Sequence, residues 1–367
     1  MPLKEIAIKE IAIPPSTSTV SVRAFDVHAE TFRVPASSLV DPVLPGRQTM
    51  EPVPGFVFLI EHLNANGRQR RLMFDLGTRK DLEGFAPKLK EMVSSNPLAR
   101  LDVERDIVDQ LTEGGIDLKS IDTVIWSHTH IDHVGDLSKW PTDTKLVLGA
   151  GSDRKSYPSY PNAILLDSDF AGREVEEIDF TKSALKIAGL PAIDFLGDGS
   201  LYLLDMPGHC AGHLVGLARV KSNSFILFGA DTCHHVGQIR PNAHLHKAYP
   251  CPGHILDAAR NSISVEHFGL PGDSEFNLRK RETPLLTIPP PPSGYEDREQ
   301  SIESQKSLSV LDAHQDIFLV LSHDATVMGT ISLFPETLNE WKEKGWKRNT
   351  IWSFLEEGNS SFRFSPC

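Results

Sequence analysis

The sequence predicts a layered fold of the α/β or α+β class. Short apolar runs of strand length recur along the chain, and segments with apolar residues at helical spacing lie between them. The chain has 367 residues, of which 40% are hydrophobic and 23% charged, so its composition is that of an ordinary globular protein with ample length for a large core. Strands mixed with helices in this way are expected to pack as layers around that core.

The first 150 residues are expected to be rich in strands. An irregular arm over residues 1–18 contains Pro14-Pro15, which stops regular structure, and residues 34–54 hold five prolines and predict a long loop. Val103, Ile107 and Leu111 fall at helical spacing and predict a helix that stops at Gly114-Gly115. Strands are predicted at residues 20–27, 56–61, 71–75, 123–126 and 145–148, with a hairpin turn at residues 64–67 between the second and the third.

The second half is expected to continue with a meander of antiparallel strands. Residues 234–298 are the least regular part of the chain and are interpreted as an insertion rather than a separate domain. A helix at residues 301–314 and a strand at 317–321 follow, and residues 335–357 are predicted to be helical around a break at Gly345. The strands of the meander are predicted at residues 192–196, 201–205, 214–220 and 225–228.

The charge of the chain argues against nucleic acid and membrane partners. It has 37 Lys and Arg residues against 49 Asp and Glu residues, a formal charge of −12, which repels phosphate backbones and anionic lipid surfaces. No apolar run approaches the roughly 20 residues that span a bilayer, and the charged N-terminus lacks the apolar core of a signal peptide. We therefore expect a cytoplasmic protein, either a monomer or a homodimer. The four cysteines show neither metal-binding nor disulfide-framework spacing: Cys210, Cys233, Cys251 and Cys367.

The most informative stretch is Ser-His-Thr-His-Ile-Asp-His-Val-Gly-Asp at residues 127–136. It follows the predicted strand at residues 123–126, so its polar side chains lie where a strand ends and a loop turns toward a helix. Alternate residues of an extended segment point the same way, and the following turn can aim the later side chains at a second position. One short loop could therefore serve two cations. The candidate ligands are His128, His130, Asp132 and His133.

Four further ligand-capable residues each follow an apolar strand: Asp75, His209, Asp231 and His323. A strand fixes the backbone while the loop at its end exposes the side chain, which is how a rigid scaffold holds a site. The donors are nitrogen and oxygen without thiolate, which suits zinc and also iron, manganese or cobalt. They are too many for one tetrahedral ion and fit two divalent ions roughly 3.5–4 Å apart. The local sequence does not assign particular ligands to each ion.

These residues resemble the motifs of the metallo-β-lactamase superfamily. The H-x-H-x-D-H motif is present at residues 128–133, and the remaining family motifs match over roughly residues 50–330. The resemblance implies a four-layer αββα sandwich with loop insertions and with the metal site at one edge of the paired sheets. It implies a single domain over residues 1–367, with a core at about 50–330, an N-terminal arm at 1–18, an insertion near the site at 234–298 and a C-terminal helical segment at 335–367.

The resemblance also implies a role for each candidate residue. His128, His130 and His209 would hold one ion, while Asp132, His133 and His323 would hold the other and Asp231 would bridge the two. Asp75 would support the metal loop by hydrogen bonding, without binding metal itself. Among the residues outside the motifs, His213 is expected to pack and hydrogen-bond behind the site. Small apolar packing is expected for Cys210 and Cys233, and a place in the core is expected for Tyr295.

Within the superfamily the spacing is most similar to the lactonase-type branch and to fungal lactamase-like members. Residues 27–54 and 234–298 would be the variable loops that gate the substrate. Two departures from the family pattern stand out. The Gly-Gly that often follows the motif is Gly135-Asp136, and a tyrosine often found three residues after the bridging aspartate is His234. That tyrosine handles the substrate carbonyl in lactonases, so its replacement weakens the case for simple homoserine lactones and leaves His234 or His235 as the substrate contact.

The sequence thus predicts a dinuclear metal-dependent hydrolase that opens a small cyclic ester or amide: a lactone, lactam or cyclic carbamate. A metal-bound hydroxide would attack the ring carbonyl, and the ions would stabilise the oxyanion. Asp132 would hold a metal and pass a proton to the leaving group.

Other activities use the same metal core. A thioesterase acting on glutathione conjugates needs a basic anchor that does not stand out, a nuclease conflicts with the charge of −12, and a persulfide dioxygenase uses one iron and fewer ligands. A metal-free binding protein of this fold is a further alternative, which the retention of all the donors argues against.

Overall fold

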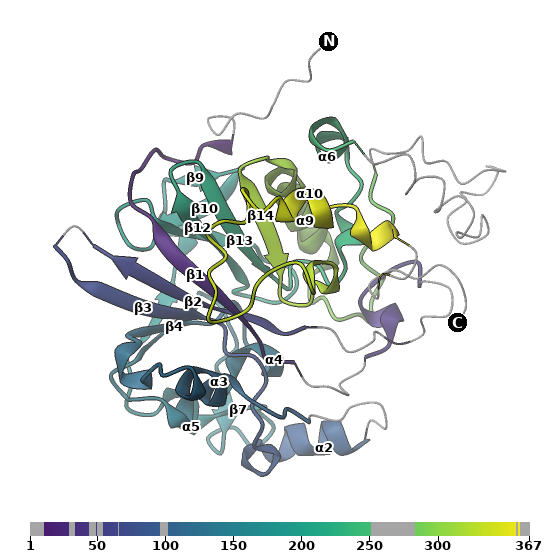
Figure 1. Cartoon of the computed structure of the whole chain (residues 1–367). Helices are drawn as coiled ribbons and strands as arrows, with labels where there is room; N and C mark the ends of the chain where they lie inside the picture. Colours follow the sequence, from purple (N-terminus) through teal and green to yellow (C-terminus); the bar gives the residue numbers. More distant parts are fainter. Residues whose placement is uncertain are drawn as a thin grey trace.

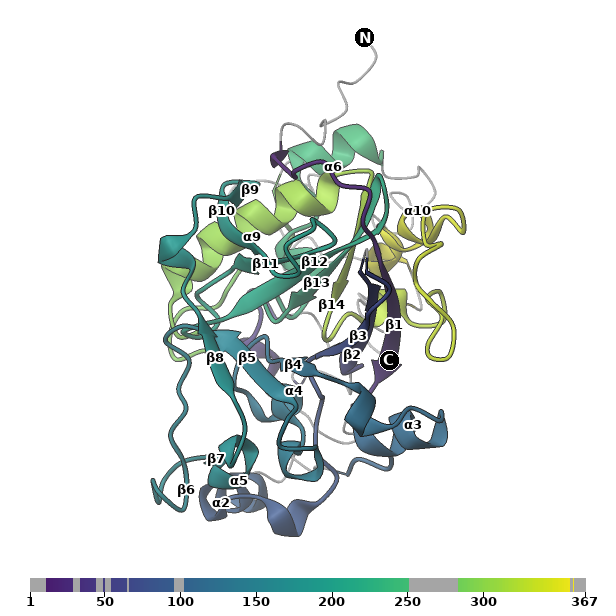
Figure 2. The same cartoon turned by 90° about the vertical axis from the view of Figure 1, so that its left-hand side faces the viewer.

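The structure is a computed structural model that describes residues 11–28, 34–43, 49, 54–64, 66–95, 102–250, 283–356 and 359. Two six-stranded sheets form its centre, and Figures 1 and 2 show them stacked face to face. The first sheet has the order β1 (Val20–Asp26), β2 (Phe56–Leu63), β3 (Gln69–Phe74), β4 (Thr123–Ile125), β5 (Lys145–Gly149) and β8 (Val175–Ile178). The second has the order β14 (Ile317–Leu321), β13 (Ser224–Ala230), β12 (Leu214–Lys221), β11 (Leu201–Asp205), β10 (Leu190–Asp194) and β9 (Lys186–Ile187).

A small third sheet, seven α-helices and several 3₁₀ turns complete the described part of the chain. A small parallel pair joins β6 (Ser156–Tyr157) to β7 (Leu165–Leu166). The α-helices are α2 (Pro87–Ser95), α3 (Ile107–Glu113), α4 (Ile131–Val134), α5 (Asp167–Phe170), α6 (Ala243–Ala248), α9 (Arg298–Ala313) and α10 (Trp346–Thr350). The 3₁₀ turns are η1 (Ala36–Ser38), η2 (Leu82–Gly84), η3 (Leu118–Ser120), η4 (Leu137–Lys139), η5 (Phe180–Lys182), η6 (Val236–Gln238), η7 (Ala325–Val327) and η8 (Ser353–Leu355). No described helix is both long and apolar enough to cross a bilayer.

Three hydrophobic clusters separate four layers. The middle cluster lies between the sheets, where the rings of Phe58 and Phe228 stack at 4.2 Å. A second cluster packs α2 and α3 against the outer face of the first sheet, and a third packs α9 against the outer face of the second. Successive residues of β13 alternate between these clusters, because Ile226 faces the other sheet while Leu227 faces α9. The predicted αββα sandwich is confirmed (Figure 1).

Backbone hydrogen bonds join the two sheets at one edge of the sandwich. The N–H of Phe56, at the start of β2, donates to the carbonyl of Ser322 just after β14 over 2.9 Å. The N–H of Leu214, at the start of β12, donates to the carbonyl of Ser127 just after β4, also over 2.9 Å. Ser127 and Ser322 each immediately precede a candidate ligand, so the two sheets are connected next to the predicted site.

The prediction of helix over residues 335–357 is wrong for most of that range. Within the described residues, regular helix is limited to α10, with the short turn η8 after it. The segment before α10 instead covers the free edge of β1: the N–H of Phe334 and Leu338 donate to carbonyls of that strand, each over 2.8 Å. The side chain of Asn339 pairs with the backbone N–H of Val22 and the carbonyl of Val20, each at 3.0 Å. Backbone groups used in this way are unavailable for helical hydrogen bonds.

The helix predicted from Val103 begins four residues later than expected. Asp106 caps α3, because its carboxylate accepts from the N–H of Asp109 over 3.0 Å while the Asp109 side chain accepts from the N–H of Asp106 over 3.2 Å. This reciprocal capping fixes the start of the helix. Val103 lies before the cap and is buried against the first sheet.

The predicted terminal arm and the predicted insertion fall only partly on described residues. In the arm, Ile11 and Ile13 are buried against the second sheet, and residues 1–10 lie outside the described part. In the insertion, η6 and α6 are described, whereas residues 251–282 lie outside. The last eight residues, 360–367, also lie outside. The division of the chain into one domain with these appendages stays a prediction.

Candidate metal centre

Ligand-capable side chains follow five strands at their carboxyl ends. β3 and β4 are parallel neighbours in the first sheet, as are β13 and β14 in the second. β11 runs in the same direction as β13, because each is antiparallel to β12. In α/β proteins, ligands bind at the carboxyl ends of strands. The side chains found there are Asp75 after β3, His128 after β4, His209 in the turn after β11, Asp231 after β13 and His323 after β14.

The loop that carries the H-x-H-x-D-H motif is fixed by backbone bonds to the end of β3. The carbonyl of His133 accepts from the N–H of Leu76 over 2.8 Å, and the N–H of Gly135 donates to the carbonyl of Gly77 over 2.9 Å. Gly135 has a φ of +56°, and a Cβ at this position would lie 2.5 Å from the Cβ of Leu76. Only glycine fits such a turn, which ends α4 and brings the chain against Leu76 and Gly77 after β3.

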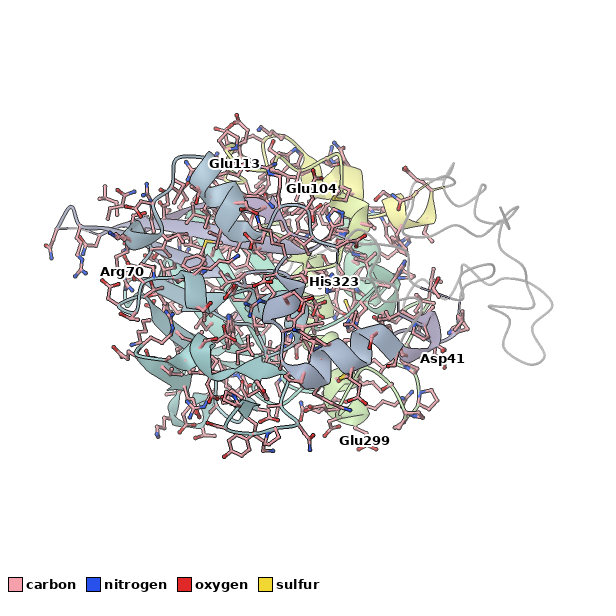
Figure 3. The ribbon with its side chains drawn as sticks, turned by 90° about the horizontal axis from the view of Figure 1, so that it is seen from below. Asp41, Arg70, Glu104, Glu113, Glu299 and His323 are labelled. Atoms are coloured by element: carbon pink, nitrogen blue, oxygen red, sulfur yellow. The ribbon has the colours of Figure 1, made fainter. Side chains whose placement is uncertain are left out.

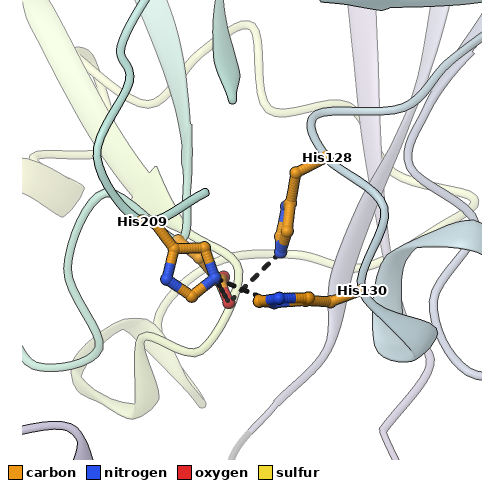
Figure 4. Close-up of side chains that lie close together, drawn as sticks. His128, His130 and His209 are labelled. Atoms are coloured by element: carbon orange, nitrogen blue, oxygen red, sulfur yellow. Dashed lines mark hydrogen bonds and ion pairs between the residues drawn. The ribbon is translucent and has the colours of Figure 1, made fainter. Parts of the chain in front are cut away.

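The candidate ligands form two groups, within each of which the donor atoms lie no more than 4.8 Å apart. The first group is His128, His130, His209 and Asp231, and the second is Asp132, His133 and His323. Figure 4 shows the three imidazoles of the first group turned toward one another, with His130 Nδ1 lying 2.9 Å from His209 Nε2. Side chains from both sheets therefore contribute to each group.

Asp231 lies between the two groups. Its Oδ2 is 3.9 Å from His128 Nε2 and 3.6 Å from His209 Nε2. Its Oδ1 is 3.4 Å from His133 Nε2 and 3.5 Å from His323 Nε2. Each oxygen of one carboxylate thus faces a different group, as the bridging role requires.

The second group is more open than the first. His323, which lies near the middle of the view in Figure 3, is held by its Nδ1, 2.9 Å from the carbonyl of Pro54. Its Nε2 is 3.4 Å from Asp132 Oδ2. The side chain of Asp132 is 26% exposed, whereas that of His133 is 1% exposed. Asp132 is therefore more accessible to solvent and to a substrate than His133 and His323, whose side chains are 1% and 13% exposed.

Two further side chains form hydrogen bonds with the candidate ligands or with the residues next to them. Asp75 accepts from the backbone N–H and the hydroxyl of Ser127, each over 2.7 Å, and lies 2.9 Å from His133 Nδ1. His213 accepts at Nε2 from the N–H of Asp231 over 3.2 Å, and its Nδ1 donates to the carbonyl of Met206 over 2.8 Å. Partners of this kind fix the orientation of the imidazoles and carboxylates that bind metal.

The buried carboxylates of the centre favour positive charge on the groups around them. Burial lowers the pKa of His128 and His209, and the neighbouring imidazoles lower it further. Burial also acts to lower the pKa of His133 and His323, but the charges of Asp231 and a second aspartate outweigh it and raise the pKa of His323 to about 10. Protons on these two histidines therefore balance the carboxylates wherever a cation does not.

Several buried nitrogen and oxygen atoms of the cluster have no hydrogen-bond partner, as is expected of atoms that bind a metal ion. These atoms are His128 Nε2, His133 Nε2 and Asp231 Oδ1. An unsatisfied buried polar atom costs about 1–3 kcal/mol, so three in one cluster indicate a missing common partner. Imidazole and carboxylate donors without thiolate suit divalent zinc, iron, manganese or cobalt. The residues present therefore fit divalent metal ions.

The comparison with protein families gives the same answer as the geometry. The sequence model of the Metallo-beta-lactamase superfamily matches residues 50–313. The chain belongs to the metallo-beta-lactamase superfamily. The match contains every member of the two groups except His323, which follows it at the end of β14.

Similar proteins place the chain in the lactonase-like and lactamase-like part of the superfamily. It is 36% identical to the gamma-lactamase FDB1 of Fusarium pseudograminearum over 94% of this chain and 84% of that protein. It is also 36% identical to the metallo-hydrolase mfmC of Annulohypoxylon moriforme over 95% of this chain and 89% of that protein. The structure of a quorum-quenching N-acyl homoserine lactone hydrolase matches with a TM-score of 0.53 and 15% identity, over 88% of this chain and 99% of that one. The predicted family and branch are confirmed, and the chain is a metal-dependent hydrolase.

In this metallo-beta-lactamase-like fold, His234 and His235, which the sequence left as alternative substrate contacts, lie in different surroundings. His234 is 8% exposed, and its Nε2 lies 3.2 Å from Asp231 Oδ2. His235 instead accepts at Nδ1 from the N–H of Gly237 over 2.9 Å, and its ring lies 6.3 Å from that of Phe354. The structure therefore brings His234 to the cluster and turns His235 away from it.

Tyr295 is buried, as expected, and it also contacts the site. The hydroxyl of Tyr295 lies 2.8 Å from His234 Nδ1, and its ring lies 5.5 Å from that of His209. No local pattern marks Tyr295, because its partners precede it by 61 and 86 residues. The thiols of Cys210 and Cys233 are buried, and burial raises the pKa of both, so they stay protonated beside the site.

Proposed function

We propose that this protein is a two-metal hydrolase that opens a small cyclic ester or amide. The observation that carries the proposal is Asp231, whose two oxygens face two separate groups of donors. A carboxylate in that position suits a pair of ions and has no equivalent role at a single ion. His128, His130 and His209 would hold one ion, Asp132, His133 and His323 the other, and zinc suits both donor sets.

The ions, when bound, would make a water molecule acidic near neutral pH and would polarise the carbonyl of the ring. The remaining work falls to the side chains. Asp75 and His213 hold His133 and Asp231 in place, so that little reorganisation is needed when charge develops on the carbonyl oxygen.

Asp132 is the residue suited to move the proton. Its side chain is 26% exposed, so it is accessible from the substrate side, and a carboxylate is ionised and able to accept a proton near neutral pH. We propose that an oxygen of Asp132 takes the proton of the attacking water and gives it to the ring heteroatom as the ring opens. The leaving group stays attached to the product, and its protonation prevents reclosure.

Cyclic amides are the preferred substrate class. The name of the relative FDB1, a gamma-lactamase, supports this preference, because the identity of 36% extends over 94% of the chain. The replacement by His234 of the tyrosine typical of lactonases is a second reason, since that tyrosine handles the carbonyl of homoserine lactones.

The first test compares metal content and activity. Purified protein should contain close to two transition-metal ions per chain and should hydrolyse at least one ring substrate, and His128→Ala should lose activity on every substrate. His244→Ala is the matched control, because it removes an exposed imidazole from α6 and should keep both properties. Protein without metal above trace, or full activity in His128→Ala, would contradict the proposal.

A substrate panel then tests the class. Lactams, cyclic carbamates, lactones and thioesters of glutathione should be compared by kcat/KM at equal metal loading. We expect the highest value for a lactam or cyclic carbamate. Turnover of thioesters alone would replace the ring-opening proposal by a thioesterase.

A further inference from the structure

His234 is a buried imidazole that the two donor groups do not include, although it faces the same carboxylate. Its Nε2 lies 3.2 Å from Asp231 Oδ2, closer than His209 Nε2 at 3.6 Å or His128 Nε2 at 3.9 Å. Its ring centroid is 4.9 Å from that of His209. The question is therefore whether Nε2 presents a hydrogen or a lone pair to the centre.

The side chain of Gln238 provides the reference point, because its orientation is fixed on both sides. Its Oε1 accepts from the backbone N–H of His234 over 2.9 Å and of His235 over 3.2 Å. Its Nε2 donates to the carbonyls of Leu39 over 3.0 Å and Thr287 over 3.4 Å. A flipped amide would lose all four bonds, so the atom facing Tyr295 is an oxygen that only accepts.

The hydrogen of the Tyr295 hydroxyl is therefore already used. Tyr295 donates it to Gln238 Oε1 over 3.2 Å, which leaves the hydroxyl oxygen as an acceptor for His234 Nδ1 at 2.8 Å. Nδ1 then carries the hydrogen, and in the neutral imidazole the lone pair lies on Nε2. A histidine that donates from one ring nitrogen to a fixed partner and presents the other is the usual arrangement of a metal ligand.

We propose that His234 is an additional nitrogen ligand of the ion that His128, His130, His209 and Asp231 would hold. Tyr295 and Gln238 are positioning residues that set its tautomer. A lone pair 3.2 Å from a carboxylate oxygen is repulsive on its own, and a cation that both atoms bind removes the repulsion. The inference rests on the proposed two-metal site and adds a donor that the H-x-H-x-D-H pattern does not contain.

The inference is tested by cobalt binding to metal-free protein, in competition with a chromophoric chelator and with the visible absorption of bound cobalt(II) recorded. His234→Ala should lower the affinity for one of two cobalt equivalents by about 10- to 100-fold and change the absorption bands. Added imidazole should partly restore the bands by filling the vacated space. His244→Ala, at an exposed position of α6, is the matched control and should leave both readouts unchanged.

Tyr295→Phe tests the positioning residue and serves if His234→Ala fails to fold. It keeps the imidazole but removes its hydrogen-bond partner, so cobalt affinity should fall by about 10-fold. Wild-type affinity and bands in both His234→Ala and Tyr295→Phe would overturn the inference. A raised KM with unchanged cobalt binding in His234→Ala would also overturn it and would make His234 a substrate contact.

The two proposals fail in different ways. If the wild type opens no ring but His234→Ala shows the cobalt effect, the ligand assignment stands and the proposed substrate class falls. If the wild type binds only one equivalent of cobalt, the two-metal proposal falls, and the ligand assignment is then decided by whether His234→Ala weakens the binding of that single ion.

Discussion

At the scale of single residues, the orientation of the candidate ligands depends on two residues whose backbone has an uncommon conformation. Asp75 and Ala230 have φ values of +59° and +43°, and each lies at the end of a strand that leads into the site. A non-glycine residue in this region costs on the order of 1–3 kcal/mol and persists only where the surrounding structure enforces it. Here the turn at Ala230 directs the next residue, Asp231, between the two donor groups.

The pH dependence of stability should reveal a buried carboxyl beneath the metal loop. Asp169 is 2% exposed, and burial raises its pKa to about 7, with Arg79 opposing the shift. Because the folded pKa lies above the unfolded value, the favourable contribution is present at low pH and is lost as pH rises from about 4 through 7. Asp169→Asn should therefore be more stable than wild type at pH 8 by about 2–4 kcal/mol and nearly equal to it at pH 4.

Urea unfolding at pH 4 and pH 8 measures this difference. Asp167→Asn is the matched control in the same helix, because hydrogen bonds from Ser156 and Ser159 lower the pKa of Asp167 and no gain at pH 8 is expected. Equal stability of Asp169→Asn and wild type at pH 8 would contradict the assignment.

The sequence predicted individual residues well where the pattern is local. The histidines of residues 128–133 lie together in the chain and in the fold, so their spacing alone indicated a metal site. Tyr295 and Gln238 could not be found in this way, because their contacts with His234 exist only once α9 and η6 have packed against the same sheet. Local spacing also could not decide between His234 and His235, which the cap at the start of η6 turns in different directions.

At the scale of elements, strands were predicted more reliably than helices. β11 and β14 begin and end at the predicted residues, since buried strands are continuous apolar runs with clear ends. Residues 335–345 have polar and aromatic residues at spacings that suit a helix, but the free edge of β1 provides better partners for their backbone. Tertiary contacts therefore decided this segment, and sequence periodicity does not include them.

The edge cover of β1 should be essential for both stability and solubility. Asn339→Ala removes two side-chain hydrogen bonds to β1 and should destabilise the protein by about 1–3 kcal/mol. An uncovered edge strand also invites pairing between molecules, so light scattering should rise on warming. Asn349→Ala, an exposed position in α10, is the control and should change the unfolding free energy by less than about 0.5 kcal/mol. A midpoint in urea equal to that of wild type for Asn339→Ala would show that the cover contributes little.

At the scale of the whole molecule, the centre joins two sheets that come from different parts of the chain. The motif loop follows β4 of the first sheet, whereas His209, Asp231 and His323 follow strands of the second. The strand order and the pairing of the sheets did not follow from local residues, which predicted only a layered fold. The pairing of the sheets came from the resemblance to a family and the strand order was not predicted, because long-range pairing is not encoded in short patterns.

Metal removal should therefore weaken the whole fold. Ions that bind only the folded state add about 2.7 kcal/mol when their free concentration is 100 times the dissociation constant. Protein stripped with a chelator should unfold at lower urea than protein with zinc restored, and His128→Ala should show a smaller difference between the two conditions. Identical urea midpoints for the stripped and the restored wild type would contradict this expectation.

The two backbone bonds that connect the sheets have a consequence for how this enzyme tolerates change. Phe56 bonds to the residue before His323, and Leu214 bonds to the residue before His128, so sliding of one sheet over the other is transmitted directly to the spacing of the donors. Substitutions deep between the sheets that shift their alignment by a few tenths of an ångström should therefore change the ion affinity even where they leave the free energy of unfolding nearly unchanged.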